Sequence, residues 1–173
     1  MSLQIVSVLD AACGGMVWQR QLIPHVQTTI PNFRYIGVDA SSVIIQKNRE
    51  ELPHLNFTVA SLVDLQIPPS VQLILNRDAL QHNSYSNIYK ILRNFASSNA
   101  SYILITNYPE GSGYCGKRSG NHNIKTGGWF CIDLEQRPFL LTPDKKIKEG
   151  TSDKKWIYLY SRRNLKAQLK KFG

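Results

Sequence analysis

Short apolar runs, separated by polar segments of helix length, mark the first two-thirds of the chain. These runs are continuous rather than alternating, which is typical of strands buried on both faces of a parallel sheet. The runs begin near residues 4, 35, 56, 71 and 102, and they predict strands over 4–9, 35–39, 56–60, 71–75 and 102–106.

The segments between the runs predict helices. We expect one helix over about 16–26 and a second that begins at Ser41 or Ser42, because a serine hydroxyl can satisfy a free backbone N–H there. Residues 84–97 place Ile88, Ile91, Leu92 and Phe95 on one helical face. Strands that alternate with helices predict an α/β, Rossmann-like, doubly wound and mostly parallel sheet.

The texture changes after residue 109. Residues 110–128 contain six glycines and predict a long loop. Residues 132–141 and 156–161 predict two more strands, which would complete a seven-stranded sheet with a C-terminal antiparallel hairpin. Residues 162–173 predict a short helix or a frayed tail. The length of 173 residues fits a single domain over 1–173.

The gross composition excludes several classes of protein. No stretch approaches 18 consecutive apolar residues, so we expect no membrane span and no membrane partner. Cys13, Cys115 and Cys131 form no CxxC pair, and the histidines form no HExxH pattern, so no metal site is expected. The odd cysteine count indicates no disulfide framework and favours a reducing compartment, which predicts a cytoplasmic location.

Positive charge is concentrated near the C-terminus. The net charge is +9, and residues 141–173 hold 10 basic and 3 acidic side chains, whereas residues 1–140 are nearly balanced with 11 and 9. Such a stretch indicates either a solvated face or an anionic partner such as nucleic acid. The sequence leaves the partner and the oligomeric state open.

Polar residues follow three of the predicted strands, where open α/β sheets bind ligands. The turn from Asp10 to Gly15 is built of small residues, Asp39 ends the second strand, and Asn76-Arg77-Asp78 follows the fourth. The dinucleotide fingerprint GxGxxG is absent. An acid such as Asp39 can accept hydrogen bonds from both hydroxyls of a ribose, so these residues favour a nucleoside ligand.

Three segments resemble motifs of the class I S-adenosylmethionine-dependent methyltransferases: VLDAACGG (8–15), YIGVDAS (35–41) and LILNRDALQH (73–82). The chain is most similar to a subgroup with Asp-x-x-Cys-Gly followed by Trp, Arg-Asp-x-x-x-His, and Thr-Gly-Gly-Trp before Pro-Phe. Here those residues are Asp10, Cys13, Gly14 and Trp18; Arg77, Asp78 and His82; and Thr126 to Trp129 with Pro138-Phe139. The resemblance covers about residues 5–161.

The resemblance implies S-adenosylmethionine as cofactor and a methyl transfer to an unknown acceptor. It implies that Asp39 binds the ribose and that His82 is the best candidate base, with Asp78 beside it. The other implied cofactor contacts are Asp10, Ala12, Cys13 and Gly14 at the methionine part, Ala40 and Ser61 at the adenine, and Asn76 and Arg77 at the amino group. The implied substrate side also includes Gly127, Gly128 and Trp129.

The chain departs from this pattern in three places. Met16-Val17 stand where relatives carry a glycine, and Ser61 stands where they usually carry an acid, with Asp64 three residues on. The chain also begins about three residues before its first predicted strand, so a cover for the cofactor would come from elsewhere, unless the chain is a fragment or the site is degraded. Two alternatives therefore stay open: a non-catalytic methyltransferase-like binding module, and a nucleic-acid methyltransferase that uses the basic C-terminal region.

Simpler structural roles also stay open for the same residues. Asp10 could cap the turn, Asp39 could cap the following helix, and Asp78 could pair with Arg77. His82 could be a solvated or capping residue at a helix start.

Overall fold

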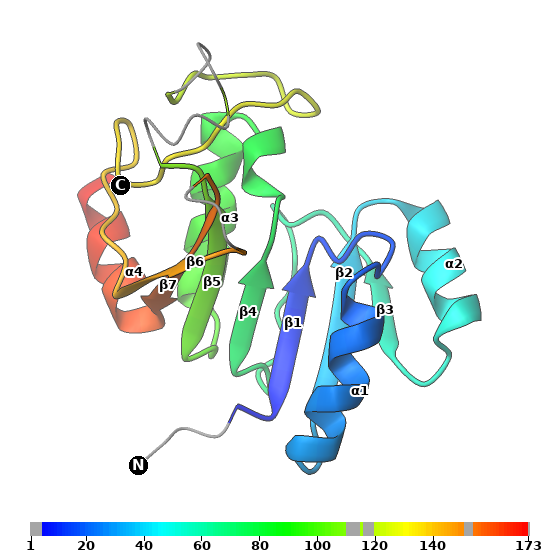
Figure 1. The fold of residues 1–173 in the computed structure, drawn as a ribbon. Coiled ribbons are helices and arrows are strands. Elements are labelled where there is room, and N and C mark those ends of the chain that lie inside the picture. Colours follow the sequence, from blue (N-terminus) through cyan, green and yellow to red (C-terminus); the bar gives the residue numbers. More distant parts are fainter. Residues whose placement is uncertain (1–4, 110–114, 116–119, 151–153, 173) are drawn as a thin grey trace.

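The computed structural model describes residues 5–109, 115, 120–150 and 154–172. Across these residues, seven strands form one sheet in the order β3-β2-β1-β4-β5-β7-β6 (Figure 1). Neighbouring strands from β3 to β5 pair in parallel, whereas β7 is antiparallel to β5 and β6. This confirms the predicted Rossmann-like sheet with its antiparallel C-terminal pair. The strands are β1 (Ser7–Ala11), β2 (Arg34–Asp39), β3 (Asn56–Val59), β4 (Leu73–Asn76), β5 (Tyr102–Asn107), β6 (Lys145–Lys148) and β7 (Trp156–Ser161).

The strand order reverses at β1, which pairs with β2 on one side and β4 on the other. Asp10 of β1 lies opposite Gly37 of β2 and Leu75 of β4. This register brings the carboxyl ends of the three strands to one edge of the sheet. A crevice at such a switch point is where open α/β sheets bind ligands.

Two pairs of helices cover the sheet. Helices α1 (Gln19–Thr29) and α2 (Ser42–Glu51) lie on one face of the sheet, over its β1–β3 half. Helices α3 (Tyr85–Ser97) and α4 (Arg162–Leu169) lie on the other face (Figure 1). The Ser41 hydroxyl accepts from Ile44 N, as the predicted cap requires. Residues 162–172 are helical, with η3 (Lys170–Phe172) following α4, so the tail is a short helix.

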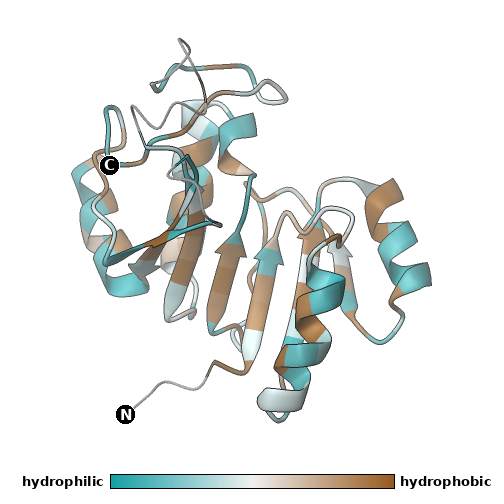
Figure 2. Ribbon diagram, in the orientation of Figure 1, coloured by the Kyte–Doolittle hydropathy of each residue, from teal (hydrophilic) through white to brown (hydrophobic). Residues whose placement is uncertain are grey.

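The main core lies between the sheet and the α3–α4 layer. Strands β1, β4 and β5 are largely apolar (Figure 2), and buried side chains such as Ile74, Ile103 and Tyr160 alternate with half-buried ones. A second cluster packs under α1 and α2 and contains Cys13, Met16, Ile23, Tyr35, Ile45 and Phe57. This smaller cluster fixes the turn that follows β1.

The strand predicted over 132–141 is wrong. This segment forms successive turns, because side-chain amides take the place of a neighbouring strand: Asn107 Oδ1 accepts from Leu134 N, and Asn121 Nδ2 donates to Arg137 O. Pro138 has no N–H to give to a ladder. The partner of β7 is instead β6, whose sequence KKIK is exposed at every position and gave no apolar signal.

The prediction that the cysteines form no disulfide is also wrong. Cys115 is bonded to Cys131, with 6.2 Å between their Cα atoms, and Cys13 is a buried free thiol. The cysteine count therefore no longer supports a reducing compartment. Most of the glycine-rich loop, residues 110–114 and 116–119, lies outside the described residues. No helix in the described part of the chain is long and apolar enough to cross a membrane.

Candidate functional site

A pocket of about 560 Å³ opens at the switch point. It brings together most of the predicted site residues, from both the cofactor set and the substrate set. Those that line it are Asp10, Ala12, Cys13, Gly14, Asp39, Ala40, Ser61, Arg77, Asp78 and His82. Asn76, Gly128 and Trp129 are not among the lining residues.

The turn after β1 is fixed tightly against β2. The N–H groups of Ala12 and Cys13 both donate to Val38 O at 2.9 Å, and Gly14 N donates to Asp39 Oδ2 at 3.1 Å. A Cβ at Gly37 would meet the Phe57 ring of β3 at 2.7 Å and Cys13 Sγ of the turn at 3.0 Å, so glycine lets both pack closely against β2. The N–H groups of Ala12, Cys13 and Gly14 are therefore all bonded within the protein and are not available as donors to a ligand. A ligand would instead make van der Waals contact with the small residues of the turn.

Asp39 ends β2 at the mouth of the pocket. Its Oδ1 accepts from Ser41 N at 2.9 Å, while its Oδ2 accepts from Gly14 N. Asp39 therefore positions the start of α2 and also lines the pocket. A carboxylate has about four lone-pair sites, so two acceptor positions remain for ligand hydroxyls.

Asp10 is 1% exposed and lies deep in the pocket. Its Oδ2 accepts from Gln19 Nε2 at 2.8 Å and from Tyr35 OH at 2.7 Å. Its side chain bonds these side chains rather than the amides of the turn, so it is not a turn cap. Burial raises the pKa of the Asp10 carboxyl, and the hydrogen bonds from Gln19 and Tyr35 offset part of that rise.

Three buried acceptor atoms near the end of β1 have no hydrogen-bond partner: Asp10 Oδ1, Gln19 Oε1 and Asn76 Oδ1. The amide nitrogens of Gln19 and Asn76 donate to Cys13 O and Ala11 O, each at 2.8 Å, and this orients their oxygens. Buried polar atoms are nearly always paired. A cluster of acceptors without donors fits a ligand that supplies N–H groups, above all a cationic amine.

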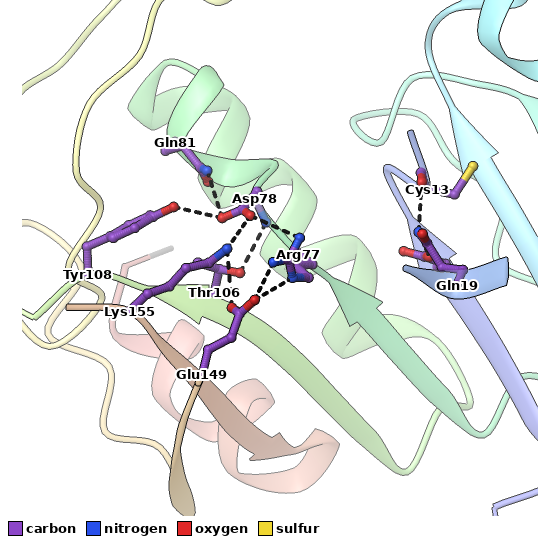
Figure 3. A network of polar contacts seen from close by, with 10 residues as sticks. Cys13, Gln19, Arg77, Asp78, Gln81, Thr106, Tyr108, Glu149 and Lys155 are labelled. Carbon is purple, nitrogen blue, oxygen red and sulfur yellow. Dashed lines mark hydrogen bonds and ion pairs between the residues drawn. The ribbon is translucent and has the colours of Figure 1, made fainter. Parts of the chain in front are cut away.

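Asp78 is the centre of a polar network at the other end of the pocket (Figure 3). Its Oδ1 accepts from Tyr108 OH at 2.7 Å, and its Oδ2 pairs with Lys155 and lies 3.3 Å from Arg77 Nη1. Glu149 accepts from Arg77 Nε at 2.8 Å and lies 3.2 Å from Lys155 Nζ. The C-terminal hairpin is thereby tied to the turn after β4.

This network decides the state of Asp78. Burial alone would raise the pKa of the Asp78 carboxyl, but hydrogen bonds from Lys155 and Tyr108 and the nearby cationic charges outweigh it and lower the pKa. Asp78 is thus an ionised carboxylate with its oxygens already engaged. The structure thus contains the predicted ion pair between Asp78 and Arg77. Because the pKa of the Asp78 carboxyl is lowered, Asp78 is poorly suited to accept a proton from an acceptor.

His82 is exposed and has a free ring nitrogen. Its Nδ1 lies 2.9 Å from Gly128 O. Because a carbonyl only accepts, Nδ1 carries the proton, and in the neutral ring Nε2 is left as an acceptor.

Gly127 N donates to His82 O, and Phe130 N donates to Gln81 O, so the segment with Trp129 is held against η1 (Leu80–His82). Trp129 itself is 43% exposed and is not a core residue.

Several site residues gave no signal in the sequence. Gln19 and Tyr35 orient Asp10, and Tyr108, Glu149 and Lys155 hold Asp78. Lys155 belongs to the basic C-terminal stretch, and the sequence gives no sign that any lysine of that stretch is buried. Only the tertiary fold shows that this one lysine points inward, with 15% of its side chain exposed.

The strand order, the switch-point pocket and the acid at the end of β2 define a Rossmann-like fold of the methyltransferase class. The model of the methyltransferase domain family matches residues 8–99, a little over half of the chain. The protein therefore belongs to this methyltransferase domain family. No curated protein matches the chain.

Solved structures share the fold at low sequence identity. The PH0226 protein of Pyrococcus horikoshii OT3 superposes with a TM-score of 0.64 at 16% identity, over 90% of this chain and 81% of that one. The mitomycin 7-O-methyltransferase MmcR gives 0.65 at 12% identity, over 91% of this chain and 49% of that one. PKMT2 of Rickettsia typhi in complex with AdoHcy gives 0.53 at 19% identity, over 65% and 23%. The chain thus spans half or less of the last two.

Proposed function

We propose that the protein transfers a methyl group from S-adenosylmethionine to an acceptor whose proton is taken by His82. The observation that carries this proposal is a single pocket with Asp10 and Asp39 at one end and His82 at the other. The structural likeness to PKMT2, which was solved with AdoHcy, supports the choice of cofactor.

The residues present fit this cofactor. The unpartnered oxygens of the pocket residues Asp10 and Gln19 suit its amino group, and the two remaining acceptor positions of Asp39 suit the ribose hydroxyls. Ala40 and Ser61 line the pocket where the adenine would lie. When bound, S-adenosylmethionine supplies an electrophilic methyl group on sulfur.

The protein's own contribution is orientation and proton transfer. Nε2 of His82 would take the acceptor's O–H or N–H proton, while Nδ1–H stays hydrogen-bonded to Gly128 O. The methyl group that the cofactor would supply leaves its sulfur for the acceptor atom, and S-adenosylhomocysteine is the leaving thioether. Holding both reactants in one pocket makes the encounter effectively intramolecular, which is the main source of rate in such a displacement.

Titration calorimetry with S-adenosylhomocysteine tests the cofactor assignment. We expect the wild-type protein to bind and Asp39→Asn to lose at least about tenfold in affinity, since hydrogen bonds to a charged acceptor contribute about 1.5–3 kcal/mol each. Asp64→Asn is the matched control, because Asp64 is exposed and does not line the pocket. No binding by the wild type, or equal losses in both variants, would contradict the assignment.

A radiolabelled methyl-transfer assay over hydroxyl, amine and thiol acceptors then separates an enzyme from a binding module. Turnover with any acceptor supports the proposed activity. Cofactor binding without turnover across the panel would favour the non-catalytic alternative.

A further inference from the structure

We propose that the α3–α4 layer is a docking surface for the phosphate backbone of nucleic acid. Helices α3, α4 and η3 carry seven basic side chains and no acidic one. All seven are exposed, and we call them the basic surface: Lys90, Arg93, Arg162, Arg163, Lys166, Lys170 and Lys171. This inference goes beyond the proposed methyl transfer and does not depend on it.

The helices that carry the basic surface pack against each other. α3 and α4 are in contact, Arg93 Nη2 donates to Phe172 O at 2.8 Å, and Arg162 Nη1 donates to Ser98 O at 2.9 Å. These two bonds join α3 to η3 and to the start of α4. They also hold two guanidinium groups in place, which reduces the entropy lost when an anion binds.

Within the described part of the chain, no acidic side chain neutralises the charges of the basic surface. Across the described residues, no ion pair involves any of the seven side chains. The nearby Asp144 accepts from Ser161 N and so serves the start of α4. Arg162 and Arg163 moreover occupy the first turn of α4, where the helix dipole disfavours cations. This arrangement is unfavourable in the free protein and is relieved by an anion.

The chemistry of the surface favours nucleic acid over a membrane. Surface helices that bind membranes combine basic residues with exposed apolar side chains that enter the lipid. In the described part of the chain, none of the exposed large hydrophobic residues belongs to α3, α4 or η3. Arginine matches phosphate oxygens with a two-pronged geometry, and three of the seven side chains are arginines.

The spacing of the charges suits a phosphate chain. At a rise of 1.5 Å per residue, Arg163 and Lys170 lie roughly 10 Å apart along the helix axis, and a nucleic-acid duplex carries one charge per roughly 1.7 Å of its axis. Of the aromatic side chains in the layer, Phe95 is fully buried, whereas Tyr85, Tyr89 and Phe172 are half-buried and contact one another or Phe139 in edge-to-face or tilted geometry. Recognition would therefore use phosphates rather than base stacking, and it would be independent of sequence.

Fluorescence anisotropy with labelled 20-base-pair RNA and DNA duplexes tests the proposal. We expect binding at about 25 mM salt that weakens steeply up to about 200 mM, with a log–log slope near −0.9 per phosphate contact. The triple variant Arg163→Gln/Lys166→Gln/Lys170→Gln should bind at least about tenfold more weakly, with a slope reduced by up to about three.

The matched control removes three exposed charges elsewhere: Arg34→Gln/Lys47→Gln/Lys145→Gln. It should lose much less affinity than the first triple variant. Equal losses would show a general charge effect and overturn the proposal. So would an absence of binding at low salt, a strong preference for one base sequence, or binding to phosphatidylserine vesicles without binding to either duplex. The assay needs no methyl transfer, so its failure leaves the proposed activity untouched.

Discussion

The Tyr35 hydroxyl donates a 2.7 Å hydrogen bond to Oδ2 of Asp10, with both side chains almost fully buried. Burial and the charge of Asp10 raise the pKa of the Tyr35 phenol, so Tyr35 remains a donor at every physiological pH. Together with Gln19, it keeps one carboxylate oxygen occupied and leaves the other for the pocket. One tyrosine thus orients the deepest charge of the site.

Tyr35→Phe should destabilise the protein by about 1–3 kcal/mol, because it leaves a buried carboxylate with one donor fewer. The free energy of unfolding in urea measures this. Tyr102→Phe is the control, since Tyr102 is half-buried and lies on β5, three strands away from β2 in the sheet; it should change stability by less than about 0.5 kcal/mol. Equal effects would show that ring packing, rather than the bond to Asp10, sets the loss.

Asp10→Asn should make the protein more stable and less able to bind the cofactor. The pKa of Asp10 is raised in the folded state, so stability falls as pH rises from the unfolded value, 3.8, through the folded one. The variant escapes this loss, and its gain in thermal midpoint should be present at pH 7 and vanish below about pH 3.8. Its amide would face the cofactor's amino group with a donor, so affinity for S-adenosylhomocysteine should fall. A variant that is both less stable and still tight-binding would contradict this role.

The fold was largely predictable, and the reason is visible in single strands. Runs such as Tyr102–Asn107 are apolar because they lie in the middle of the sheet, where one row of side chains, such as Ile103 and Ile105, is fully buried in the main core. β6 was missed because KKIK is an exposed edge strand, where pairing depends on its partner β7 rather than on its own composition. The turns over 132–141 were misread because Asn107 and Asn121, distant in sequence, satisfy their backbone.

The site was predictable only where one short segment carries it. Asp39 and the turn after β1 are local features of strand ends, and both line the pocket. The partners of Asp78 come from three separate parts of the chain, with Lys155 lying 77 residues away. Spacing cannot show such contacts, because they depend on how β7 packs beside β5.

Lys155→Met should weaken the link between the hairpin and the turn after β4. At neutral pH the loss should be about 1 kcal/mol, since hydrogen bonds to charged groups are strong but this pair is partly exposed. The pKa of Asp78 is lowered in the folded state, so its contribution is present above the unfolded value, 3.8, and is lost as pH falls through the folded value.

Lys155→Met should therefore lose less stability than the wild type on acidification through this range. Unfolding curves between about pH 2 and 7 check this. Lys154→Met, at the exposed neighbouring position, should follow the wild-type pH profile. Coincident pH profiles for Lys155→Met and the wild type would show that Lys155 does not set the ionisation of Asp78.

His82→Gln should lower kcat by about 100- to 10,000-fold with any acceptor that must lose a proton, because general-base catalysis is worth that much. Glutamine can still donate to Gly128 O, so the affinity for S-adenosylhomocysteine should be unchanged. His54→Gln, exposed in the loop before β3, is the control. Full activity in His82→Gln would exclude His82 as the base.

Gly128, whose carbonyl orients the His82 ring, and Lys155, which pairs with Asp78, both lie beyond residue 99, where the family match ends. The matched segment thus supplies Asp78 and His82, while the residues that hold them in place come from outside it. Changes around Gly128 or in the β6–β7 hairpin should therefore alter how His82 and Asp78 are held and leave the turn after β1 unchanged.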